Sequence, residues 1–143
     1  MNPPTARQRL QWLAAAHGVD VGFDDIWGGR HEVSDTGLRA LLGDLGVRAD
    51  SDADVERGLA MTHRRYWQRL AEPVVALGAP AAALEVLVRL ARHGPDERIA
   101  WQLTMESGAV LRGEAGVDAL APGEGTDVDG VRSESRTLRI DAA

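Results

Sequence analysis

Hydrophobic residues in the first half of the chain recur at intervals of three and four positions, which is the spacing of one face of an α-helix. This pattern predicts three amphipathic helices, each preceded by a Thr, Ser or Asp residue that can cap its first turn. We expect the helices to pack on one another through these faces. They are predicted at 6–16 (Leu10, Leu13, Ala14 and His17), at 35–45 (Leu38, Leu41, Leu42 and Leu45) and at 54–70 (Val55, Leu59, Thr62, Tyr66 and Leu70).

A tight turn is predicted between the first two helices. Gly28–Gly29 can adopt backbone angles that are closed to other residues, so the chain is expected to reverse there. The reversal would let 19–23 pair with 32–33 as a short hairpin. Polar side chains flank the glycines, and we expect Asp25 or His31 to bond to the backbone of the turn.

From Pro73 onward the period of the pattern changes from 3.6 to 2, which is typical of β-strands. A segment rich in Gly and Asp, about 115–133, interrupts this alternation and is predicted to be a long mobile loop. Short strands joined by hairpin turns favour an antiparallel sandwich of immunoglobulin-like kind. The five predicted strands lie at 74–77, 84–90, 99–106, 109–114 and 136–140.

The change of period predicts an α+β protein with a helical subdomain at 1–71 and a β-sandwich at 72–143. An immunoglobulin-like sandwich has about seven strands, so we expect this one to be incomplete and to have an open edge. A dimer that pairs or exchanges edge strands would cover that edge.

The amino-acid composition mainly excludes classes of function and of partner. With 143 residues, 44% of them hydrophobic and 27% charged, the chain has the composition of a soluble globular protein. A net charge of −6, with no basic cluster beyond Arg64-Arg65, argues against a nucleic-acid partner. The absence of cysteine excludes disulfides and thiolate chemistry. Since neither a signal peptide nor a long apolar run is found, we expect a cytoplasmic protein without a membrane partner.

The residues around the predicted turn form a specific motif. The chain carries Asp25-Ile26-Trp27-Gly28, His31, Val33-Ser34, Leu38, Ala40-Leu41-Leu42 and Leu45-Gly46. This series resembles the N-terminal extension of bacterial 4-alpha-glucanotransferases, the amylomaltases, in which a D-x-W-G-x-x-H-x-V-S turn leads into a T-L-x-A-L-L-x-x-L-G helix. Gly37 departs from the family pattern by replacing a better helix former. The resemblance in sequence covers about the first third of the chain. Beyond it, only the order of predicted elements, helices followed by strands, is similar.

The resemblance implies an accessory N-terminal domain of an enzyme that transfers α-1,4-glucan segments between maltooligosaccharides by a retaining mechanism. The catalytic part of that family is a (β/α)₈ barrel of about 250 residues, and none of its carboxylates matches a position here. We therefore expect this chain to be non-catalytic, with the barrel of the parent chain as its partner and α-glucan as a second one. The alternative is a freestanding binding or protein-interaction module with no enzymatic partner in cis.

No catalytic, cofactor-binding or metal site is expected from the residues themselves. The densest polar pairs, Asp24-Asp25 and His31-Glu32, lack further ligands at suitable spacing. We therefore expect no metal and no cofactor.

The four tryptophans are the remaining candidates for binding, because flat indoles stack on sugar faces. Trp101 alternates with apolar residues and is predicted to lie in the core. Trp27 is expected to fill the helical cluster, with its N–H bonded nearby. Trp12 and Trp67 lie off the main faces of their helices. The candidate glucan or interface contacts are Trp12, Trp27 and Trp67.

Overall fold

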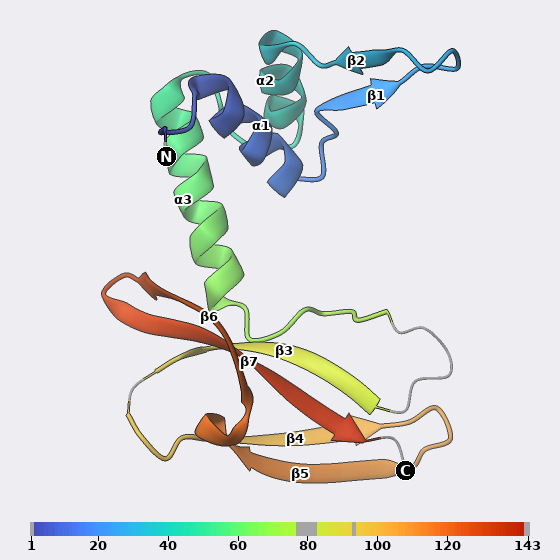
Figure 1. The fold of residues 1–143 in the computed structure, drawn as a ribbon, viewed down its shortest axis with the longest axis vertical. Coiled ribbons are helices and arrows are strands. Elements are labelled where there is room, and N and C mark those ends of the chain that lie inside the picture. The colour runs from blue at the N-terminus through green and yellow to red at the C-terminus, as the bar shows by residue number, and fades with distance from the viewer. Residues whose placement is uncertain (1, 77–82, 93, 142–143) are drawn as a thin grey trace. The chain divides into compact units, whose positions relative to one another are not determined.

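The computed structural model describes residues 2–76, 83–92 and 94–141, which belong to two compact units, Met1–Arg65 and Tyr66–Ala143 (Figure 1). These residues combine helices with antiparallel sheets, so the fold is mixed α+β, as predicted. The boundary between the units falls inside a helix, whereas the sequence placed it after residue 71. No helix in the described part of the chain combines the length and apolar character that crossing a membrane requires.

Helices at the three predicted places form the first unit, which ends within the last of them. They are α1 (Ala6–Ala16), α2 (Asp35–Asp44) and α3 (Asp52–Gln68). The predicted caps are present. Thr5 and Gln8 form a reciprocal capping box at the start of α1, and the Ser34 hydroxyl accepts a hydrogen bond from the Gly37 N–H at the start of α2.

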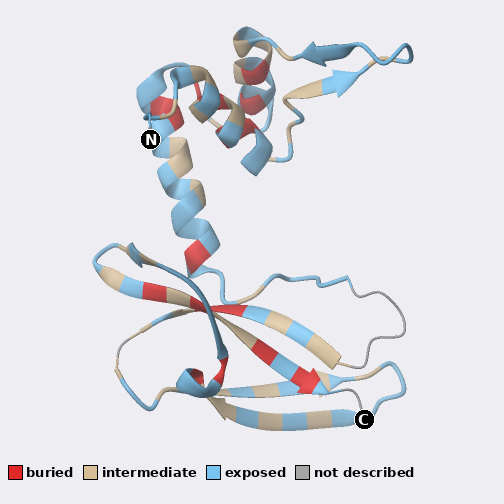
Figure 2. Cartoon of the chain, in the orientation of Figure 1, coloured by how far each residue is buried: buried red, intermediate tan, exposed pale blue. Residues whose placement is uncertain are grey.

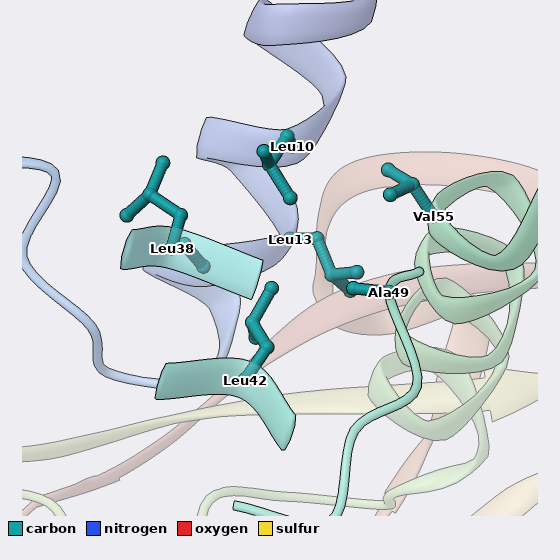
Figure 3. Close-up of a cluster of buried hydrophobic side chains, with 7 residues drawn as sticks. Leu10, Leu13, Leu38, Leu42, Ala49 and Val55 are labelled. Atoms are coloured by element: carbon teal, nitrogen blue, oxygen red, sulfur yellow. The ribbon is translucent and has the colours of Figure 1, made fainter. Parts of the chain in front are cut away.

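A small leucine core holds these helices together, with its side chains pointing toward one another (Figure 3). The predicted four-leucine face of α2 divides: Leu38 and Leu42 are fully buried, whereas Leu41 is 44% exposed and Leu45 is also exposed. The core is too small to cover a wider face of this short helix. Its buried members are Leu10, Leu13, Ala14, Leu38, Leu42, Ala49 and Val55.

The predicted hairpin between α1 and α2 is present and lies closer to the turn than expected. Strand β1 (Gly22–Asp24) pairs antiparallel with β2 (Arg30–Glu32), and Phe23 lies opposite His31. The pairing of 19–23 with 32–33 is therefore confirmed in part.

The described residues of the second unit form five strands, which lie in two layers. The sheet β3-β7-β6 packs against the hairpin β4-β5 through Val88, Leu138 and Ile140 on one side and Ile99, Trp101 and Leu103 on the other. Buried positions concentrate on β3 and β7 (Figure 2). The strands are β3 (Ala83–Ala91), β4 (Arg98–Thr104), β5 (Val110–Gly116), β6 (Ala121–Val128) and β7 (Val131–Asp141).

The prediction of a long loop at 115–133 is wrong. Its residues form the end of β5, a 3-10 turn at Val117–Ala119, strand β6 and the start of β7. The glycines of this segment allow close approach between strands. A Cβ atom on Gly123 would lie 2.3 Å from Ser135 Oγ on the neighbouring strand. The turn itself has only two residues, Asp129 and Gly130, both with positive φ (53° and 80°), as type I′ hairpins require.

The predicted strand at 74–77 is also not observed. Residues 74–76 form no strand, and Leu77 lies outside the described residues.

Candidate functional site

The turn between β1 and β2 is built around the carboxylate of Asp25. Its Oδ1 accepts hydrogen bonds from the backbone N–H groups of Trp27 (2.9 Å) and Gly29 (2.8 Å), and its Oδ2 lies 2.8 Å from His31 Nε2. Gly28, with a φ of +81°, donates its N–H to the Asp25 carbonyl. The prediction that Asp25 or His31 bonds to the backbone of this turn is confirmed for Asp25, whereas His31 bonds to the Asp25 side chain.

Hydrogen bonding to the ionised carboxylate lowers the pKa of Asp25, with His31 as the largest cause and the N–H groups of Gly29 and Trp27 next. The carboxylate is therefore ionised at neutral pH and holds the turn as an anion. This arrangement fixes the backbone on both sides of Trp27.

We expect the turn to loosen when the pH falls through the lowered pKa of Asp25. Because this pKa is lower in the folded than in the unfolded chain, the stabilisation is complete above the unfolded value of about 3.9 and is lost below it. An NMR titration of the Trp27 and Gly29 amide resonances would follow this loss. Asp24→Asn, at the adjacent exposed residue, should leave the transition in place, whereas Asp25→Asn should abolish it. Resonances that do not move in acid would contradict this prediction.

The fixed turn presents two large apolar side chains to solvent. Ile26 is 88% and Trp27 is 85% exposed. Phe23, also exposed, stacks on the His31 ring at a centroid distance of 5.2 Å. The prediction that Trp27 fills the helical cluster is therefore wrong, because leucines fill that core and Asp25 holds the turn open. We call Phe23, Ile26 and Trp27 the Trp27 tip.

The other two candidate tryptophans differ in exposure and in place. Trp12, on α1 in the first unit, is 54% exposed. Trp67, in the second unit, is only 7% exposed and meets the Tyr66 ring edge-on at 5.6 Å. The sequence placed Tyr66 on the buried face of its helix, whereas the structure buries Trp67 and exposes Tyr66. Of the three candidates, only Trp12 and Trp27 thus offer a free indole surface.

A groove of about 460 Å³ runs along α3 in the first unit. Arg57, Met61 and Arg65 lie on one side of this helix, and Leu45 and Arg48 lie on the segment that follows α2. We call these five residues the α3 groove. Sequence reasoning missed it because Leu45 was placed on the packed face of its helix and the only basic cluster noted was Arg64-Arg65. The spacing of four between 57, 61 and 65 was the available signal.

The buried carboxylate beside the α3 groove is already used by the fold. Asp54 is buried and accepts a hydrogen bond from the Ser51 hydroxyl (2.6 Å), and it also contacts the guanidinium groups of Arg48 and Arg57. The Ser51 hydrogen bond is the largest cause of a lowered pKa at Asp54, and the two arginines lower it further. Arg65 makes no ion pair with any described residue, so the groove retains positive charge.

A second cavity, of about 450 Å³, lies beside Trp67 and Arg89 in the second unit. Arg89, a charged residue between the apolar Val88 and Leu90 of β3, is buried. Its Nε donates to the Arg69 carbonyl (3.0 Å), its Nη2 donates to Glu72 (2.6 Å), and its guanidinium lies 4.1 Å from the Tyr66 ring centroid. These contacts satisfy the charge within the fold and give Arg89 a structural role.

Among the described residues, no group of three or more His, Asp or Glu side chains could hold a metal ion. The first unit presents exposed apolar side chains on the Trp27 tip and arginines along the α3 groove, and such surfaces can bind a partner. Comparison with protein-family models, with curated proteins and with solved structures finds no match.

Proposed function

We propose that this chain is an accessory N-terminal domain of a 4-alpha-glucanotransferase, an enzyme that transfers α-1,4-glucan segments between maltooligosaccharides by a retaining mechanism. One observation carries the proposal. Residues of the resembling motif have distinct structural roles here: Asp25 holds the turn, Gly28 adopts a positive φ, His31 bonds to Asp25, and Ser34 caps α2. A motif with this division of roles supports a shared local structure better than a match of apolar residues would.

In this proposal the chain acts by binding, and the carboxylates of a downstream barrel carry out the transfer. The Trp27 tip and Trp12 supply apolar surface for the barrel or for the face of a glucose ring. The proposed location is the cytoplasm.

The second unit is proposed to be an immunoglobulin-like sandwich with an open edge. Its two packed layers support this, and in the described residues β4 and β5 pair only with each other as strands. Such edges can pair with further strands of a parent chain or with a second copy.

The first test is the intact mass of the native gene product, followed by glucose release from maltotriose by that product. We expect a mass far above that of 143 residues. Removal of residues 1–143 should reduce kcat/KM by about 2- to 10-fold without abolishing transfer, because remote binding energy contributes to the transition state. A native product of only 143 residues, or one without transferase activity, would overturn the proposal.

The second candidate is a freestanding interaction module. The exposure of Ile26 and Trp27 on a fixed turn favours it, since exposed Trp residues are typical anchors of protein interfaces. A native product of this length that binds a partner through Trp27 would support this candidate instead.

A further inference from the structure

We infer that two copies of this chain associate by insertion of the Trp27 tip of one copy into the α3 groove of the other. The inference uses only residues of the first unit and does not depend on the proposed enzyme. The partner in this interface is a second copy of the chain.

The tip has the properties of an anchor. Ile26 and Trp27 are adjacent and almost fully exposed, so docking would remove a large apolar area from water. The three contacts of the Asp25 carboxylate already fix the turn. Little backbone freedom would therefore be lost on binding, which favours association by a preorganised element.

The α3 groove offers the tip both space and apolar side chains. Its volume of about 460 Å³ falls within the usual range for pockets that enclose a ligand. Leu45 and Met61 are both exposed at its wall, where an indole could cover them. In one copy Trp27 remains 85% exposed, so the tip does not fill the groove of its own chain.

Opposite charges on the hairpin and on the α3 groove favour the hairpin of a second copy as the occupant of the groove. The hairpin segment 20–32 carries four acidic residues against one arginine, namely Asp20, Asp24, Asp25 and Glu32 against Arg30. The α3 groove carries Arg48, Arg57 and Arg65. Arg48 pairs with Asp50 and Asp54, and Arg57 pairs with Asp54, whereas Arg65 makes no ion pair with any described residue. In a chain with a net charge of −6, this groove is a local positive surface that would attract the acidic hairpin. The same acidic residues disfavour an anionic membrane as the occupant.

Insertion in both directions gives an isologous, closed dimer, in which each copy supplies one tip and one groove. This interface is distinct from the open sheet edge of the second unit. Variants of the first unit can therefore separate the two modes of association.

The test is sedimentation velocity of the 143-residue chain over a range of concentrations. We expect a reversible dimer that weakens with added salt. Trp27→Ala and Arg65→Glu should each raise the dissociation constant at least about tenfold, because each removes one side of both contacts. Trp12→Ala, at the other exposed indole of the first unit, is the matched control and should leave association unchanged.

Mixing the two weakened variants tests the pairing directly. Trp27→Ala retains its groove and Arg65→Glu retains its tip, so the mixture should associate more strongly than either variant alone. Circular dichroism would verify that both variants remain folded. A chain that stays monomeric, a dimer unaffected by both substitutions, or a mixture no stronger than its components would overturn the inference. A monomer would leave the proposed enzyme assignment untouched.

Discussion

Replacing Leu42 with alanine should lower the free energy of unfolding of the first unit by about 2–5 kcal/mol. Leu42 is fully buried and contributes to a core with few large side chains. The substitution removes apolar contacts and leaves a cavity that the fixed helices around it can fill only in part. Since small domains are stable by only about 5–15 kcal/mol, this loss is a large fraction of the total.

Leu41 provides the matched control for this experiment. It is the preceding residue of the same helix and is 44% exposed, so Leu41→Ala should cost less than about 1 kcal/mol. Urea unfolding followed by far-ultraviolet circular dichroism measures both variants, because the described helices lie mainly in the first unit. Equal losses at 41 and 42 would contradict the burial pattern.

Replacing Gly113 with alanine should destabilise the second unit by about 1–3 kcal/mol. Gly113 lies directly opposite Trp101 in the β4-β5 hairpin, and a Cβ atom there would lie 2.4 Å from the Trp101 ring. The indole also packs against the core of this unit, so it can move aside only by losing contacts. The clash should therefore exceed the gain of about 0.5–1 kcal/mol that alanine normally brings to a strand.

Gly116, on the same strand, is the control because a Cβ atom there would meet no atom within 4 Å. Gly116→Ala should be neutral or slightly stabilising when thermal unfolding is followed by near-ultraviolet circular dichroism. In a Trp101→Leu background, the difference between the two alanine variants should shrink. If the difference persists there, the indole is not its cause.

Local signals predicted the helices of the first unit well. Thr5 and Ser34 cap helices because their side chains reach N–H groups a few residues away, and this needs no distant partner. The Asp25 turn is equally local, since each of its bonds joins residues within 25–31. The local sequence was therefore sufficient to predict the helix caps and the Asp25 turn.

Strand β6 shows where interpretation of local signals failed. Glycines at 123 and 125 and the polar residues around them resembled a loop, although Asp129-Gly130 is a strong hairpin signal. The glycines are needed because the neighbouring strand approaches closely, and that neighbour is found only in the folded sheet. Composition alone does not distinguish these two uses of glycine.

The tertiary structure decided which side chains are exposed to solvent. Leu41, Tyr66 and Trp67 each belong to a correctly placed helix, yet their burial differed from what the pattern predicted. The periodicity of a segment limits which residues share a face, but the neighbours that cover that face come from distant parts of the chain.

The sequence by itself determined the three helices with their caps and the strands predicted at 84–90, 99–106, 109–114 and 136–140, because hydrogen bonds and apolar spacing within short segments specify them. Only the tertiary structure decided that Trp27 faces solvent, that Trp67 and Arg89 are buried, and that the arginines of α3 line a groove. These features depend on which segments cover one another, and that follows from packing the whole unit.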